Sequence, residues 1–160
     1  MGATTDDFRL AEADLRVWQN RDAVAEVVAA AVSLLESGLD TPNLRILAGE
    51  DHAEADEVER FLDATLHDLG LVPLQRRDAV LAVASRLARR ALADEASAEE
   101  VAPALWQLFA REPMTAEWPG TFVRLAYAAD AVEDLPDSSE SMPEFMAAAR
   151  EFLAARGARS

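Results

Sequence analysis

The amino-acid sequence predicts an all-α protein, a bundle of about seven helices whose neighbours are mostly antiparallel. Apolar residues recur three and four positions apart along most of the chain, which is the spacing of one helix face. Residues typical of helix starts and ends separate these segments at short intervals. No stretch shows the sustained alternation that indicates a strand. A length of 160 residues is enough to bury a real core, so we predict a single helical domain over residues 1–160.

The first helices are marked by their end signals. Residues 1–20 fit either a helix or an extended segment, and their shared apolar face favours a helix. Residues 22–37 carry a second apolar face, and Gly38 suits the left-handed backbone conformation that ends a helix. Thr41 before Pro42 is typical of an N-cap followed by the first helical residue. This pair therefore predicts a short third helix.

The later helices are predicted from capping pairs and apolar spacing. Asp51 and Glu54 resemble a capping pair that opens a helix ending at Gly70, and Ser97 with Glu100 forms a capping box. The remaining segments follow in order: a helix over about 77–93, one from Ser97 through Phe109, one over about 119–133, an acidic loop over 134–141, a last helix from Ser141 and a frayed tail over 156–160.

Composition excludes several classes of protein. The chain has no cysteine, so disulfide scaffolds, cysteine-bound metals and thiol nucleophiles are excluded. No apolar run reaches the roughly 20 residues of a membrane span, and the N-terminal segment lacks the apolar region of a secretory signal. A formal net charge of −15 repels nucleic acids and anionic membrane surfaces. We therefore predict a cytoplasmic protein with no cofactor, no nucleic-acid partner and no membrane partner.

One segment resembles a known group of proteins. Residues 36–49 read ESGLDTPNLRILAG, which is similar to a pattern G-x-D-[ST]-P-x-L-R-x-L-A-G in short helical proteins of actinobacteria. The pieces PALW at 103–106 and LAYAAD at 125–130 match the middle and rear of that pattern. Glu50 departs from it, because an apolar residue is expected after the glycine. The resemblance implies a helical fold and carries no activity, substrate or cofactor.

A stripe of acidic and histidine residues is the candidate metal or acid–base site. His52, Asp56, Glu59, Asp63 and His67 share one side of the helix predicted over 51–70. An i,i+4 pair, His52 with Asp56 or Asp63 with His67, is spaced to hold a divalent ion. The stripe faces away from the apolar residues and spans about 22 Å at 1.5 Å per residue, which is too long for one ion. A solvated helix face is the favoured interpretation.

Two other groups are candidates for partner binding. Trp106 lies at the edge of its helix and Trp118 at a helix entrance, where either is placed to insert into a partner. Packing in the core is the favoured interpretation for both. Arg86, Arg89 and Arg90 form a basic patch that suits an acidic peptide or phosphate. The favoured interpretation is that this patch offsets the acidic front half of the chain by meeting the acidic stripe.

These observations favour a non-enzymatic protein that binds another protein. Nucleotide-binding, serine-hydrolase and zinc-protease motifs are all missing. A strong negative field speeds the capture of a cationic partner, so an immunity- or antitoxin-like inhibitor of a basic protein is one concrete form. The alternative from another class is a metal- or small-molecule-dependent helical enzyme that uses the helix from His52 to His67. A third hypothesis is a scaffold that forms homo-oligomers through Trp106.

Overall fold

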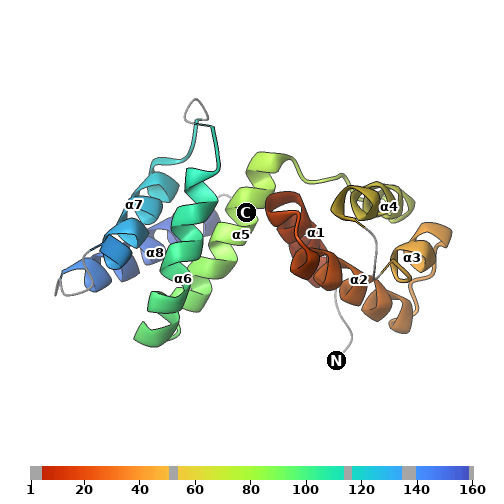
Figure 1. Cartoon of the computed structure of the whole chain (residues 1–160), viewed down its shortest axis with the longest axis horizontal. Coiled ribbons are helices and arrows are strands. Elements are labelled where there is room, and N and C mark those ends of the chain that lie inside the picture. Colours follow the sequence, from red (N-terminus) through yellow and green to blue (C-terminus); the bar gives the residue numbers. More distant parts are fainter. Residues whose placement is uncertain (1–4, 51–53, 114–116, 135–139, 159–160) are drawn as a thin grey trace. The chain divides into compact units, whose positions relative to one another are not determined.

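The helical prediction is confirmed by a computed structural model, which describes residues 5–50, 54–113, 117–134 and 140–158. These residues form eight helices and contain no strand, and residues 1–20 supply the first helix. None of the eight combines the length and the apolar composition that crossing a membrane requires. The helices shown in Figure 1 are α1 (Thr5–Trp18), α2 (Arg21–Glu36), α3 (Pro42–Leu47), α4 (Ala55–Asp68), α5 (Arg76–Ala91), α6 (Glu95–Ala110), α7 (Gly120–Asp134) and α8 (Ser141–Gly157).

Contacts along the chain define two compact units, Met1–Val83 and Ala84–Ser160. Helices α1 to α4 belong to the first unit and α6 to α8 to the second, and the boundary falls within α5. The single domain over residues 1–160 stays a prediction. Most of the loop predicted over 134–141 lies outside the described residues, as does the end of the tail predicted over 156–160. The start of that tail is helical, because α8 extends through Gly157.

The core of the first unit is built from one apolar face of each of its first four helices. Helix α1 packs against α2, α3 packs against α4, and α2 and α4 contact further members of the group (Figure 1). The apolar spacing in residues 1–20 is confirmed, because Phe8 and Leu15 are fully buried. The largest buried side chains of the other three helices are Leu34, Leu44, Leu47, Leu62 and Leu66.

Two helix ends in this unit, the end of α2 and the start of α3, follow the predicted signals. Gly38 has a φ of 96°, and the backbone N–H of Leu39 donates to the carbonyl of Leu34 at 3.2 Å. This is the left-handed ending that a side chain at position 38 would strain. The hydroxyl of Thr41 accepts from the backbone N–H of Leu44 at 3.2 Å, which confirms the N-cap before Pro42.

The largest fully buried side chains of the second unit are phenylalanine and leucine. Helix α7 packs against both α6 and α8, and α6 also contacts α8 (Figure 1). This three-helix contact encloses the fully buried side chains of Leu105, Leu108, Phe122, Phe145 and Phe152. Leu105 and Leu108 are three positions apart on α6 and both are fully buried, as the apolar spacing of this helix predicts.

Two predicted helix starts differ from the structure. The capping box at Ser97 is wrong, because α6 begins two residues earlier and Asp94 is its N-cap. The Asp94 carboxylate accepts from the backbone N–H of Ser97 at 2.8 Å, so Ser97 is a donor in the first turn. Helix α4 begins at Ala55, and Glu54 in the N-cap position makes no side-chain capping bond. Asp51, its predicted capping partner, lies outside the described residues.

The cap of α6 predicts a specific pH dependence of stability. The hydrogen bond from the Ser97 backbone holds the pKa of Asp94 below its ordinary value of 3.8. The cap therefore contributes its full stabilisation above that ordinary pKa and loses it as the pH falls through the lower pKa of the folded state. Asp94→Asn keeps a capping oxygen that does not titrate. We expect the difference in unfolding free energy between wild type and Asp94→Asn to be constant above about pH 5 and to fall below about pH 4.

Urea unfolding followed by circular dichroism at several pH values measures this difference. Asp68→Asn is a matched control from the end of another helix. A wild-type minus Asp94→Asn difference that stays constant down to pH 2.5 would contradict the assignment of Asp94 as the cap.

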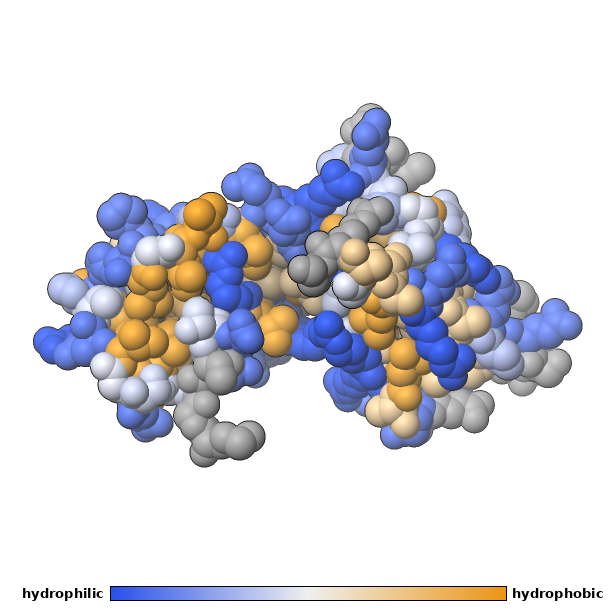
Figure 2. Space-filling model, turned by 180° about the vertical axis from the view of Figure 1, so that it is seen from behind, coloured by the Kyte–Doolittle hydropathy of each residue, from blue (hydrophilic) through white to orange (hydrophobic). Residues whose placement is uncertain are grey.

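Some large apolar side chains remain at the surface. In the first unit these are Val32, Leu39, Ile46 and Val72, and in the second unit Tyr127. Figure 2 shows hydrophobic surface interspersed with hydrophilic surface on both units. Scattered apolar residues of this kind are normal at a protein surface. Tyr127 differs from the others because it belongs to an aromatic cluster.

Candidate binding pocket

The structure brings the two predicted partner-binding tryptophans into the wall of one pocket. Trp106 lies on α6, and Trp118 lies in the segment just before α7. The pocket belongs to the second unit and has a volume of about 410 Å³. Its lining consists of Trp106, Phe109, Ala110, Glu112, Pro113, Trp118, Val123 and Tyr127. Aromatic and aliphatic side chains therefore dominate the wall, as in sites that bind organic groups.

Three of the lining rings form one continuous aromatic surface. The ring centroids of Trp106 and Phe109 are 6.0 Å apart, and each lies 5.8 Å from the centroid of Tyr127. These separations are those of interacting aromatic pairs. Phe109 follows Trp106 by three positions, so both rings leave α6 on the same side. Tyr127 meets them from α7 and is 54% exposed, which keeps the aromatic surface open to solvent.

A buried phenylalanine supports this surface from below. Phe122 is fully buried, and its ring centroid lies 5.7 Å from Phe109 and 5.2 Å from Trp118. Both contacts are edge-to-face, the arrangement that aromatic quadrupoles favour. Phe122 also contacts Phe152 of α8 at 5.9 Å. The pocket wall is therefore continuous with the core of the second unit.

Two polar groups belong to the pocket. Glu112 is only 9% exposed and is the charged residue of the lining. The indole Nε1 of Trp118 is enclosed and has no hydrogen-bond acceptor among the described residues. The ring of Trp118 makes an edge-to-face contact with Phe122.

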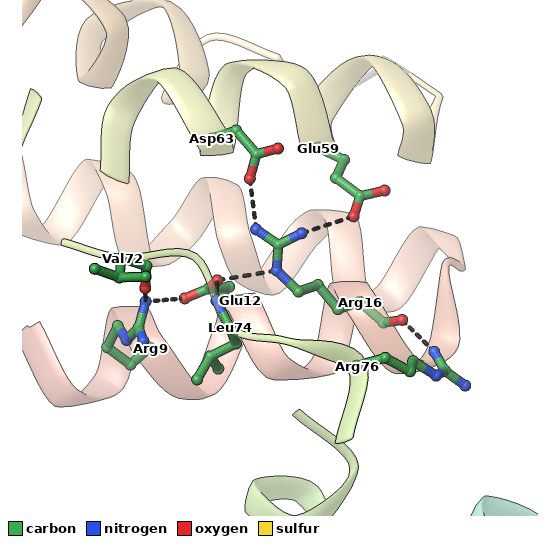
Figure 3. A network of polar contacts seen from close by, with 8 residues as sticks. All are labelled: Arg9, Glu12, Arg16, Glu59, Asp63, Val72, Leu74 and Arg76. Atoms are coloured by element: carbon green, nitrogen blue, oxygen red, sulfur yellow. Dashed lines mark hydrogen bonds and ion pairs between the residues drawn. The ribbon is translucent and has the colours of Figure 1, made fainter. Parts of the chain in front are cut away.

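Two residues of the predicted acidic stripe, Glu59 and Asp63, belong to a polar network. Arg16 of α1 donates to Asp63, and to Glu59 at 2.9 Å (Figure 3). Asp56 and His67 are exposed, and His52 lies outside the described residues. Within the described ranges no three histidine, cysteine or acidic residues are grouped as metal ligands would be. The stripe's metal-binding role stays a prediction.

Glu12 is the centre of this network, and no pattern in the sequence indicates this role. Its side chain is 0% exposed and accepts from Arg16 Nε at 2.9 Å, from the Leu74 backbone N–H at 2.7 Å and from Arg9 (Figure 3). Burial alone would lower the pKa of Arg16, but the hydrogen bonds to Asp63 and Glu12 outweigh it and raise the pKa. Arg9 also donates to the carbonyl of Val72 at 2.8 Å. The network joins α1, α4 and the segment before α5.

The basic patch of α5 remains at the surface. Arg86, Arg89 and Arg90 are all exposed. Arg90 forms an ion pair with Glu100 of α6 at 2.6 Å, whereas Glu59 and Asp63 of the acidic stripe are bound by Arg16. Exposed ion pairs of this kind contribute little stability. The role of this patch in binding an acidic peptide or phosphate stays a prediction.

Comparisons with protein-family models, with curated proteins and with solved structures find no match to this chain.

Proposed function

We propose that this protein binds another protein through the aromatic pocket of its second unit. The observation that supports the proposal is that Trp106 of α6 and Trp118, which precedes α7, line one pocket together with Phe109 and Tyr127. Tryptophan and tyrosine are enriched among the residues that contribute most to protein–protein affinity. Their rings offer a large contact area with few rotatable bonds, so little conformational entropy is lost on binding.

Charge selects the kind of partner. The net charge of −15 attracts a cationic protein over long distances and repels anionic competitors. An immunity- or antitoxin-like inhibitor of a basic protein is a concrete form of this function. The proposal needs no catalytic group, because the pocket supplies contact area and a negative field.

The test compares the wild-type chain with Trp106→Ala in binding to a partner identified by affinity purification. We expect Trp106→Ala to weaken the Kd at least about thirtyfold, which corresponds to a binding contribution of about 2 kcal/mol. Val72→Ala is the control, because the Val72 side chain is 78% exposed in the first unit. Circular dichroism confirms that both variants are folded. Equal affinities for Trp106→Ala and wild type would refute the pocket as the binding site.

Salt provides a second measurement on the same complex. We expect the Kd to rise as sodium chloride is increased from 50 to 500 mM, because salt screens attraction between exposed charges. The association rate constant should account for most of this change. A neutral partner whose affinity is insensitive to salt would contradict the electrostatic part of the proposal.

A further inference from the structure

We infer that the pocket receives an arginine side chain of the partner, with its guanidinium stacked on the aromatic surface of Trp106, Phe109 and Tyr127. This inference depends on the proposed function and deepens it, because it names the group that the pocket recognises. It is carried by the chemistry of the lining, by the spacing of the three rings and by the charge of the chain.

The lining favours a cation over an aliphatic group. Aromatic ring faces carry negative electrostatic potential and attract cations. Glu112 adds an acidic side chain to the same wall, and the other lining residues include no basic side chain. Glu112 also interacts within the protein, so a bound cation would share this acidic side chain with that interaction. An aliphatic side chain would use the ring surface but gain nothing from Glu112.

The ring spacing favours a planar cation over a compact one. Trp106, Phe109 and Tyr127 lie 5.8–6.0 Å from one another, so they contact each other and leave no room for an ammonium group between them. They form a surface instead of a cage, and because the rings are tilted by 36°, 47° and 59° to one another, a planar group stacks on one ring face at a time. A guanidinium is planar and weakly hydrated and stacks flat on aromatic faces, whereas a lysine ammonium is a strongly hydrated point charge. The pocket therefore suits arginine better than lysine.

Short peptides test this inference without the partner. The probes are Ac-Gly-X-Gly-NH2, where X is arginine, lysine, neutral citrulline or aliphatic norleucine. Two-dimensional ¹H–¹⁵N NMR reports on the three indole N–H groups of the chain, which single Trp→Phe variants assign. We expect the arginine peptide to shift the Trp106 and Trp118 signals and leave Trp18, which lies in the first unit, unchanged. Citrulline and norleucine should bind about tenfold more weakly, and lysine should lie between them and arginine.

Two variants separate the ring surface from the acidic side chain. Tyr127→Leu keeps an apolar side chain but removes a ring, and we expect it to weaken arginine binding about fivefold. Glu112→Gln should have a similar effect, whereas the control Glu117→Gln, at an exposed acid outside the lining, should have almost none. If Glu112→Gln fails to fold, Tyr127→Leu still tests the inference, because Tyr127 is mostly exposed and its replacement should leave the protein folded.

Several results would overturn the inference. Citrulline or norleucine binding as tightly as arginine would show that the pocket does not select charge. Lysine binding more tightly than arginine would exclude guanidinium stacking. The absence of any indole shift up to 10 mM peptide would show that the pocket does not take this group.

The outcomes also distinguish this inference from the proposed function. If partner binding depends on Trp106 but the arginine peptide does not bind, the proposed function is supported and the recognition of arginine is refuted. An arginine-specific shift of the Trp106 signal, with partner binding insensitive to Trp106→Ala, would show that the pocket binds a guanidinium but is not the site at which the partner binds.

Discussion

Replacing Glu12 by alanine should lower the free energy of unfolding of the first unit by about 3–5 kcal/mol. Both carboxylate oxygens of Glu12 are engaged: Oε1 accepts from Arg16 Nε and the Leu74 N–H, and Oε2 accepts from Arg9. The alanine variant leaves the largely buried Arg16 with less compensation and the Leu74 N–H without its acceptor. Removing one member of a buried ion pair is costly for this reason, even where the intact pair adds little net stability.

Urea unfolding followed by circular dichroism and by the indole NMR signal of Trp18 measures this loss. Glu12→Gln retains the shape and one acceptor oxygen, so it should cost less than alanine. The control is Glu26→Ala, at an exposed acid of α2, where a change within about 0.5 kcal/mol is expected. If Glu12→Ala cost no more than Glu26→Ala, the network would have no role in stabilising the first unit.

Features determined by neighbouring residues were predictable from the sequence. The glycine at position 38 and the pair Thr41-Pro42 act within one turn of the chain, so their local signals identify the end of α2 and the start of α3. Apolar spacing likewise placed Phe8 and Leu15 in the core. The start of α6 was misplaced because Asp94 and Ser97 are both residues that cap helices. Only the hydrogen bond in the structure distinguishes between them.

The polar network was not predictable because its partners are distant in the chain. Arg9, Glu12 and Arg16 have the spacing of ordinary surface ion pairs on a helix. Their burial depends on α4 and on the backbone of Leu74, more than 40 positions away. No local pattern shows that Glu12 is enclosed on all sides.

The sequence indicated two residues of the candidate pocket but not the pocket itself. Trp106 at a helix edge and Trp118 at a helix entrance were identified as candidates because such positions leave a ring half-exposed. That they line the same pocket depends on how α6 packs against α7, which local spacing does not determine. Phe109 belongs to the apolar spacing of its predicted helix, which does not distinguish a core residue from a residue of a pocket wall. No sequence pattern indicated a binding role for Tyr127, which was noted only as part of the segment LAYAAD at 125–130.

Phe122 should be the residue whose loss most damages the pocket, although it does not line it. We expect Phe122→Ala to lower the free energy of unfolding of the second unit by about 3–5 kcal/mol, because the ring is fully buried. Its removal also takes away the edge-to-face contacts that position Phe109 and Trp118. Partner binding should therefore weaken even at temperatures where the variant remains folded.

Phe122→Leu separates the two effects of this substitution. Leucine fills much of the same space, so its cost in unfolding free energy should be well below that of alanine, while the two ring contacts are lost in both variants. If the aromatic contacts hold the pocket in shape, Phe122→Leu should be folded like the wild type in urea unfolding but bind the partner more weakly. If only core volume matters, Phe122→Leu should bind normally. The ratio of lost affinity to lost stability in these two variants therefore measures how far the pocket depends on aromatic geometry.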